Sequence, residues 1–283
     1  MTTAAQAMAV ATARLRAAGV RDPARDARVL LAHAARIEAA RVTLMAPEDL
    51  TPEIEDRYDR LIALRAVRVP VSHLLGERQF YGRCFKISAE VLDPRPETET
   101  VVEAALAAPF DRVLDLGTGS GAILVTLLAE MPQATGVGVD LSEAACLQAS
   151  ANAVLHRVAA RAQLLQSDWF AAVSGRFDLI VSNPPYIPAQ DLATLDDEVR
   201  RHEPRMALTD EADGLSAYRA IAADAPRHLQ RGGRVVLEIG AQQAGPVCEI
   251  LACAGFGDQQ VLHDLDGRDR VVVARHGGAT TPR

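Results

Sequence analysis

Apolar positions in the first quarter of the chain recur at helical spacing. Leu30, Ala34 and Ile37 follow this period within a stretch rich in alanine, leucine and arginine. Asp22-Pro23 is a good helix start, because aspartate can cap the first turn and proline suits the first helical position. The pattern predicts a small helical domain over residues 1–75.

The hydrophobic pattern changes near residue 76. Residues 79–87, Gln-Phe-Tyr-Gly-Arg-Cys-Phe-Lys-Ile, carry aromatic and apolar side chains on both sides of a glycine, which predicts a short β-hairpin. We expect residues 76–92 to link the helical domain to a second domain over residues 93–283. That domain opens with a Pro-Arg-Pro-Glu stretch, followed by a predicted helix that ends near Ala107.

Beyond residue 110, short apolar runs alternate with helical segments, which is typical of an α/β domain with a parallel sheet covered on both faces. We predict seven strands, over residues 112–116, 135–140, 163–166, 177–181, 234–239, 259–263 and 270–275. We predict helices over residues 122–130, 143–155, 215–229 and 242–254, with a further short helix near Phe170. The tail from Gly277 is expected to be disordered.

Composition narrows the classes of function. A chain of 283 residues with 49% hydrophobic content can bury the core of one large domain and a smaller module. The net charge of -7 argues against tight phosphate contacts, so we expect no stable nucleic-acid partner. The four cysteines form no Cys-x-x-Cys pair, which predicts reduced thiols and no metal site. The first 20 residues resemble neither a secretion signal nor a membrane span, so we expect a soluble, cytoplasmic protein, and a monomer.

A glycine-rich loop follows the first predicted strand of the α/β domain, as Asp115-Leu116-Gly117-Thr118-Gly119-Ser120-Gly121. Glycines let the backbone approach a ligand, and the helix after them presents unpaired N–H groups. The loop also satisfies the dinucleotide fingerprint, so by itself it leaves NAD and S-adenosylmethionine open. Two features favour S-adenosylmethionine: the carboxylate of Asp115, placed to meet the cationic amino group of a methionine moiety, and the lack of a second nucleotide-binding unit.

Two further acidic residues lie at the ends of predicted strands. Asp140 ends the second strand, where its carboxylate can accept hydrogen bonds from both ribose hydroxyls. Its alternative role is a cap for the next helix, which Ser142 can also provide. After the third strand, Asp168 can accept from an adenine amine, and Trp169 or Phe170 can pack near the ring. A capped turn with core aromatics also explains that spacing.

Asn183-Pro184-Pro185-Tyr186 follows the fourth predicted strand directly. The Asn183 side-chain oxygen and the Pro184 carbonyl can accept the two N–H bonds of a planar NH₂ group, and consecutive prolines hold those acceptors in a stiff geometry. Tyr186 can pack against the planar group. Because an amide or amino-purine nitrogen is a poor nucleophile, such a clamp indicates methylation of one of these two kinds of nitrogen.

These motifs resemble the class I S-adenosylmethionine-dependent methyltransferases with a seven-stranded Rossmann-like sheet. More closely, they resemble the peptide chain release factor glutamine methyltransferases, the PrmC/HemK family. The match extends to segments outside the core: Phe80-Tyr81-Gly82, residues 94–99 (Pro-Arg-Pro-Glu-Thr-Glu), residues 199–204 (Val-Arg-Arg-His-Glu-Pro), Asp213-Gly214-Leu215 with Tyr218, and residues 237–240 (Leu-Glu-Ile-Gly).

The resemblance implies transfer of a methyl group from S-adenosylmethionine to the side-chain amide nitrogen of the glutamine in the Gly-Gly-Gln motif of class I release factors. It implies that residues 117–121, Asp140, Trp169 and Asn183 contact the cofactor, together with Asp168. It implies that residues 183–186 hold the glutamine, and that the N-terminal helical domain helps to dock the protein substrate.

Three alternatives remain open at this point. The closest is a related glutamine methyltransferase that acts on a ribosomal protein, because it shares the clamp and much of the core. An adenine-N6 methyltransferase of DNA or RNA also uses this clamp, but the chain is acidic and lacks an obvious target-recognition domain. A non-catalytic cofactor-binding module would be favoured by loss of the clamp or the glycine loop, and both are intact.

Overall fold

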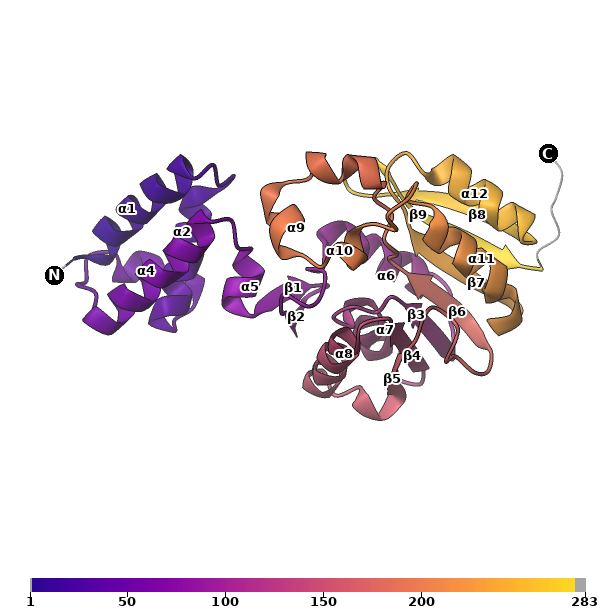
Figure 1. Cartoon of the computed structure of the whole chain (residues 1–283). Coiled ribbons are helices and arrows are strands. Elements are labelled where there is room, and N and C mark those ends of the chain that lie inside the picture. The colour runs from indigo at the N-terminus through magenta and orange to yellow at the C-terminus, as the bar shows by residue number, and fades with distance from the viewer. Residues whose placement is uncertain (1, 278–283) are drawn as a thin grey trace. The chain divides into compact units, whose positions relative to one another are not determined.

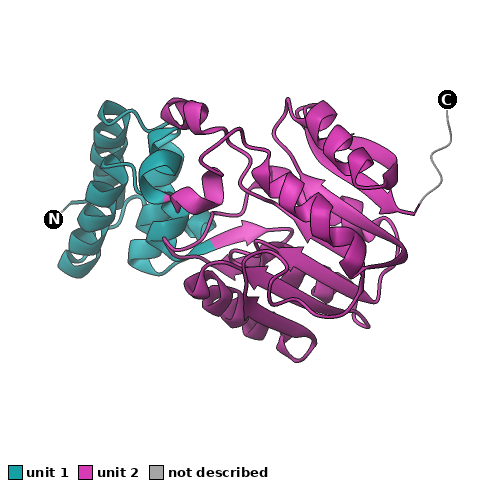
Figure 2. Cartoon of the chain, turned by 45° about the vertical axis from the view of Figure 1, so that its right-hand side comes forward, with its two compact units in different colours: residues 1–77, 196–202 teal, residues 78–195, 203–283 magenta. Residues whose placement is uncertain are grey.

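The computed structural model describes residues 2–277, which form two compact units (Figure 2). The first unit comprises residues 1–77 and 196–202, and the second comprises residues 78–195 and 203–283. The tail that the sequence predicts to be disordered lies outside the described residues from position 278 onward. Within residues 2–277, no helix is both long and apolar enough to cross a membrane.

The first unit is helical (Figure 1). Its elements are α1 (Ala4–Ala17), α2 (Pro23–Ala35), η1 (Ala39–Arg41), α3 (Val42–Met45), α4 (Pro52–Ala66) and α5 (Val71–Leu75). Asp22 caps α2 and Thr51 caps α4, each by accepting from a backbone N–H in the first turn. Leu15, Leu30 and Ile62 are fully buried between the helices, so the apolar stripe read from the sequence forms the core of this unit.

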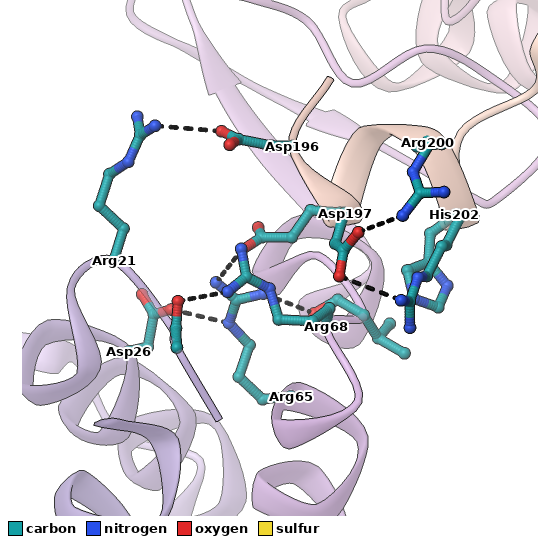
Figure 3. Close-up of polar contacts among 12 residues, drawn as sticks. Arg21, Asp26, Arg65, Arg68, Asp196, Asp197, Arg200 and His202 are labelled. Carbon is teal, nitrogen blue, oxygen red and sulfur yellow. Dashed lines mark hydrogen bonds and ion pairs between the residues drawn. The ribbon is translucent and has the colours of Figure 1, made fainter. Parts of the chain in front are cut away.

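Residues 196–202 belong to this helical unit although they follow the Asn-Pro-Pro-Tyr segment in the chain. They contain α9 (Asp197–His202), and Figure 3 shows the polar contacts around it. Glu198 lies 2.8 Å from the Arg65 guanidinium and 2.9 Å from that of Arg68. Arg65 in turn lies 2.7 Å from the carboxylate of Asp26, so a chain of ion pairs fixes this segment to α2 and α4.

A hairpin follows the helices, with strands β1 (Glu77–Phe80) and β2 (Arg83–Lys86). Its turn residues, Tyr81 and Gly82, both have positive φ, at 49° and 69°, as a tight two-residue hairpin requires. The predicted hairpin is therefore confirmed.

The second unit contains the sheet and its covering helices. Its strands are β3 (Arg112–Leu116), β4 (Thr135–Asp140), β5 (Ala162–Gln166), β6 (Phe177–Ser182), β7 (Leu229–Glu238), β8 (Phe256–His263) and β9 (Asp269–His276). Its helices are η2 (Pro96–Thr98), α6 (Glu99–Leu106), α7 (Ala122–Glu130), α8 (Glu143–Leu155), η3 (Ala159–Arg161), η4 (Ala189–Thr194), α10 (Arg205–Leu208), α11 (Ser216–His228) and α12 (Ala244–Cys253). All seven predicted strands are present, which confirms the α/β fold.

The sheet has the order β5-β4-β3-β6-β7-β9-β8. The strands from β5 to β7 are parallel, whereas β9 is antiparallel to both of its neighbours. The expectation of a parallel sheet is therefore wrong for the pairings of β9 with β7 and with β8. β8 and β9 are joined by only residues 264–268, which is too short for the crossover that parallel neighbours need.

Side chains of adjacent strand residues reach opposite faces of the sheet. Val113 packs with α6, α7 and α8, whereas Leu114 and Leu116 pack with α11 and α12 on the other face (Figure 1). Helices thus cover both faces, and the carboxyl ends of the parallel strands remain available for a binding site.

The expected short helix near Phe170 is wrong, because residues 169–172 form turns. The Ser167 hydroxyl accepts from the Ala172 N–H and donates to the Trp169 carbonyl, and these bonds close a turn in place of a helix. Trp169 has a positive φ of 46°, which a right-handed helix does not allow.

Candidate functional site

The strand order reverses between β3 and β6, where open α/β sheets usually bind their ligands. A cavity of about 740 Å³ lies at the carboxyl ends of these strands. Its walls come from residues 117–120 after β3, 139–142 at the end of β4, 167–169 after β5, Asn183 and Pro185 after β6, and parts of the segments 90–98 and 204–211. All of these residues belong to the second unit, so the cavity is complete within it.

The glycine loop forms one wall of the cavity. Gly117, Gly119 and Gly121 all have positive φ, at 69°, 54° and 78°. A Cβ atom at Gly117 or Gly119 would meet no heavy atom within 4 Å, so the backbone there faces open space. Gly121 has a different role, since a Cβ there would lie 3.0 Å from that of Ala149, and this glycine lets α7 pack against α8. The loop therefore presents bare backbone to the cavity and is held by close helix packing behind it.

Asp115 lies beneath this loop and does not line the cavity. Its side chain is fully buried and accepts from the Thr118 hydroxyl at 2.6 Å, while Oδ1 has no hydrogen-bond partner among the described residues. Burial raises the pKa of Asp115 to about 7, although the Thr118 hydroxyl and the Leu124 backbone N–H act in the opposite direction. Thr118 does line the cavity, and its hydrogen bond to the carboxyl group of Asp115 fixes its position.

Asp140 lines the cavity at the end of β4. Its Oδ2 accepts from the Gly119 N–H and its Oδ1 accepts from the Ser142 N–H, both at 2.9 Å. The cap of α8 is Ser142, whose hydroxyl accepts from the Ala145 N–H. Asp140 thus ties the glycine loop to the end of β4, and each of its oxygens keeps lone-pair capacity toward the cavity.

The residues after β5 separate into two groups. Asp168 and Trp169 line the cavity, whereas Phe170 is buried in the core and stacks on the His228 ring at 4.9 Å between centroids. Of the two aromatic candidates, Trp169 is the one at the site. The carboxylate of Asp168 is exposed and free to meet a ligand.

The Asn-Pro-Pro-Tyr segment begins directly after β6 and is anchored at both ends. Asn183 Nδ2 donates to Thr98 Oγ1 at 3.2 Å, and the Tyr186 hydroxyl donates to Glu238 Oε1 at 3.4 Å. Asn183 and Pro185 line the cavity, while Pro184 is buried and Tyr186 lies behind the wall. Burial raises the pKa of Tyr186, and the nearby Glu238 carboxyl acts in the same direction, so its hydroxyl stays protonated.

Close backbone packing also fixes this segment. The Tyr186 carbonyl accepts from Gln243 Nε2 at 2.9 Å. A Cβ atom at Gly214 would lie only 2.4 Å from that carbonyl oxygen, and Gly214 has a positive φ of 75°. Glycine is therefore required at position 214 for the segment to lie where it does.

Several cavity residues were given no role at the site from the sequence, although Thr98 and Pro204 lie in segments that resemble the family. Thr98 is buried and bonds to Asn183, and the segment from Pro204 to Glu211 supplies a wall. Asp210 organises that wall: burial raises its pKa, but hydrogen bonds from Ser216, Ala212 and Gly214 outweigh it and lower the pKa to about 2. Its ionised carboxylate is therefore a fixed acceptor for the loop. The signal for this segment was the resemblance at residues 199–204 and 213–215, which flank it in the sequence.

His202 and Glu203 do not act as a pair. The Glu203 carboxylate is buried and bonds to Arg95 within the second unit. The His202 ring nitrogen instead lies 3.2 Å from the Val67 carbonyl within the helical unit. Across residues 2–277, no group of histidine, cysteine, aspartate and glutamate side chains could hold a metal ion.

Comparison with known proteins extends over nearly the whole chain. Residues 6–76 match the family model described as the PrmC N-terminal domain, and residues 88–198 match that of the methyltransferase small domain. A release factor glutamine methyltransferase from Cereibacter sphaeroides is 56% identical over 96% of this chain and 98% of its own. A protein of the same name from Rhodospirillum rubrum is 44% identical over 94% of this chain and 83% of its own. The chain belongs to the release factor glutamine methyltransferase family.

Solved structures agree with this family at the level of the fold. A methyltransferase from Pyrococcus furiosus superposes with a TM-score of 0.55 at 16% identity, over 79% of this chain and 99% of its own. The catalytic domain of human Mettl16 superposes with a TM-score of 0.58 at 18% identity, over 78% of this chain and 84% of its own. The resemblance predicted from the sequence is confirmed, and this member of the family is a methyltransferase.

Proposed function

We propose that this protein transfers a methyl group from S-adenosylmethionine to the side-chain amide nitrogen of the glutamine in the Gly-Gly-Gln motif of class I peptide chain release factors. The observation that carries the proposal is the position of Asn183, which lines the same cavity as the glycine loop. The names of the relatives support the choice of a release factor as substrate over a ribosomal protein or a nucleic acid.

The cavity fits S-adenosylmethionine as the methyl donor. Its backbone is open at Gly117 and Gly119, so a ligand can approach the main chain there, and Thr118 and Ser120 line the same wall. The predicted contact from Gly121 would act through the packing that holds the loop. Asp140 offers carboxylate oxygens to ribose hydroxyls, while Asp168 and Trp169 offer an acceptor and a flat apolar surface to adenine. Asp115 would act through Thr118, because its own side chain does not reach the cavity. When bound, S-adenosylmethionine supplies a methyl group that its sulfonium has already activated.

The clamp must make an amide nitrogen reactive. The lone pair of that nitrogen is delocalised, so acceptors at its two N–H bonds favour the positive charge that develops on it. Asn183 Nδ2 is occupied by Thr98, which leaves Oδ1 as the acceptor atom of this side chain. The Pro184 carbonyl is the second acceptor, since neither proline offers a competing backbone N–H. Pro185, which lines the cavity, would confine the planar amide and exclude water, while Tyr186 behind the wall would hold the segment in place through its bonds to Glu238 and Gln243.

The helical unit would dock the protein substrate. Residues 6–76 match the PrmC N-terminal domain, and the unit includes the α9 segment that its ion pairs hold. The site requires no second copy of the chain, because its walls all come from one unit, and we expect a monomer that acts in the cytoplasm without stable binding of nucleic acid.

One experiment separates this proposal from its competitors. The purified protein and methyl-labelled S-adenosylmethionine are incubated with a class I release factor, its Gln-to-Ala variant in the Gly-Gly-Gln motif, ribosomal proteins, and DNA. We expect label in the release factor and none in its variant. Label in a ribosomal protein or in DNA alone would overturn the assignment. Binding of the donor without labelling of any acceptor would indicate a binding module.

A further inference from the structure

Side chains from outside the glycine loop hold it at three successive residues, 118–120. Asp115 and Asp140 hold the first two of these by hydrogen bonds. The third is Ser120, whose carbonyl accepts from Asn152 Nδ2 at 2.8 Å. Asn152 lies on α8 and is completely buried. Neither the proposed donor contacts nor the clamp makes use of this buried amide.

The Asn152 side chain also binds the hairpin. Its Oδ1 accepts from the Lys86 N–H on β2 at 2.8 Å, and its Nδ2 donates to the Lys86 carbonyl at 3.0 Å. A reversed amide would turn its NH₂ group toward an N–H and its oxygen toward two carbonyls, so these backbone groups allow one orientation only. Asn152 thus joins the glycine loop to the segment through which the chain enters the second unit.

The peptide group between Ser120 and Gly121 is held on both sides. Its carbonyl accepts from Asn152, and its N–H, which belongs to Gly121, donates to the Thr118 carbonyl at 2.8 Å. Rotation of this peptide group would therefore break both hydrogen bonds. Because Ser120 lines the cavity, the orientation of this peptide group shapes the wall that faces the donor.

We infer that Asn152 is a positioning residue that holds the glycine loop in its donor-binding conformation by bonding Ser120 to strand β2 of the hairpin. The inference rests on the proposed function, because it requires that the cavity binds S-adenosylmethionine. Asn152 does not line the cavity, so it acts on the donor through Ser120. Without its amide, the buried Ser120 carbonyl would lose the hydrogen bond that fixes it, and the loop could change conformation.

His156 provides a matched control, because it attaches the same strand to the same end of the molecule. It caps the carboxyl end of α8, and its Nε2 lies 3.0 Å from the Cys84 carbonyl on β2. Its ring also packs on Phe85, at 4.7 Å between centroids. His156→Phe keeps the ring contact and removes the hydrogen bond to β2, while the bond from Asn152 to Ser120 stays in place.

The first test is calorimetric titration of S-adenosylmethionine into the full chain. It compares the wild type and His156→Phe with two variants of similar size at position 152. Asn152→Leu removes every hydrogen bond of the amide, whereas Asn152→Asp keeps the acceptor for the Lys86 N–H. We expect both to raise the donor Kd about tenfold or more, as the loss of one hydrogen bond does, and His156→Phe to stay within about twofold of the wild type.

Kinetics with a release factor exclude a general loss of structure. At saturating donor, we expect the kcat of Asn152→Asp and its KM for the release factor to stay within about threefold of the wild type, because the clamp is intact. A damaged fold would lower kcat as well.

A second test needs neither a variant nor activity. In the isotope-labelled wild type, the hydrogen bond from Asn152 Nδ2 to Ser120 should give an NMR scalar coupling between this amide nitrogen and the Ser120 carbonyl carbon. The coupling decides the matter even if the variants at position 152 do not fold.

The outcomes separate the two claims. Variants at position 152 that bind the donor as tightly as the wild type, or no more weakly than His156→Phe, would overturn the inference alone. A folded wild type without the coupling between Asn152 and Ser120 would also overturn it. A wild type that shows the coupling but binds no S-adenosylmethionine would instead overturn the proposed function.

Discussion

The Arg65 guanidinium forms an ion pair with Glu198 at 2.8 Å, although 133 residues separate them in the chain. Arg65 is 4% exposed and also bonds to Asp26. Burial lowers its pKa, but the hydrogen bonds and charges of these two carboxylates outweigh that effect and raise it. The chain that leaves the Asn-Pro-Pro-Tyr segment is thus fixed to the helical unit at residues 196–202 before it returns to the cavity wall at Pro204.

The buried ion pairs of Arg65 predict a large effect of this residue on the stability of the protein. Arg65→Ala should lower the free energy of unfolding by about 3–5 kcal/mol, because it leaves the buried Asp26 carboxylate without its partner. Arg60→Ala on the same helix is the matched control, since Arg60 pairs with Asp56 in an exposed i,i+4 arrangement, and should change the free energy by no more than about 0.5 kcal/mol. Denaturant unfolding measures the free energy of unfolding of both variants. Equal losses would show that the buried ion pairs contribute no more to stability than the exposed pair.

The glycine loop predicts a steric effect at one position. Gly121→Ala places a Cβ 3.0 Å from that of Ala149 at a φ of 78°, so it should lower the free energy of unfolding by about 2 kcal/mol or more and weaken donor binding. Gly245→Ala, near the start of α12, meets no atom within 4 Å and should be neutral or stabilising by up to about 1 kcal/mol. Thermal unfolding and calorimetric titration of the donor check both variants; an unaffected Gly121→Ala would argue against close packing of α7 on α8.

Asp115 predicts a pH-dependent difference in stability. Its pKa is raised from 3.8 to about 7 on folding, so the folded state holds a proton that the unfolded chain releases. The stabilisation from this proton is complete below the unfolded pKa and disappears as pH rises through about 7. Relative to Asp115→Asn, the wild type should therefore lose about 1 kcal/mol per pH unit between about pH 5 and 7. Unfolding curves across this range decide the matter, and a constant difference would mean that Asp115 is ionised in the folded state.

Substitutions of Asn183 and Asp140 should affect different quantities, the rate of methyl transfer and the affinity for the donor. Asn183→Ala removes an acceptor at the clamp, so it should reduce single-turnover methyl transfer by about 100-fold while donor binding stays largely intact. Asp140→Ala removes the bonds to Gly119 and Ser142 together with the proposed ribose contact. It should raise the donor Kd by about tenfold or more, and saturating donor should recover much of the rate. Each variant is the control for the other, and identical profiles would refute the assignment of separate roles.

The elements that were predicted correctly are those whose ends are marked by neighbouring residues in the sequence. β3 and α7 have the predicted bounds, because a buried apolar strand, a glycine turn and an apolar helix follow each other without interruption. Asp22 caps its helix as the Asp-Pro pair indicates. The glycine loop and Asn183 meet at one cavity because parallel strands bring their carboxyl ends to one edge.

The features of the fold and of the site that were not predicted depend on contacts that no local sequence pattern encodes. The direction of β9 is set by its short connection to β8, and the turn at Trp169 by side-chain bonds of Ser167. Thr98 precedes Asn183 by 85 residues, and only the fold reveals that its side-chain oxygen accepts from Asn183 Nδ2. Segment 196–202 joins the helical unit through ion pairs between distant positions, which composition and periodicity do not report.

The central claim is that the cavity methylates a glutamine side chain on a protein. The most direct measurement is mass spectrometry of a class I release factor after incubation with this enzyme and S-adenosylmethionine, with Asn183→Ala as the parallel control. The account predicts a single methyl group on the side-chain nitrogen of the glutamine in the Gly-Gly-Gln motif, formed about 100-fold more slowly in the control. An unmodified glutamine, or a methyl group on any other residue, would contradict it.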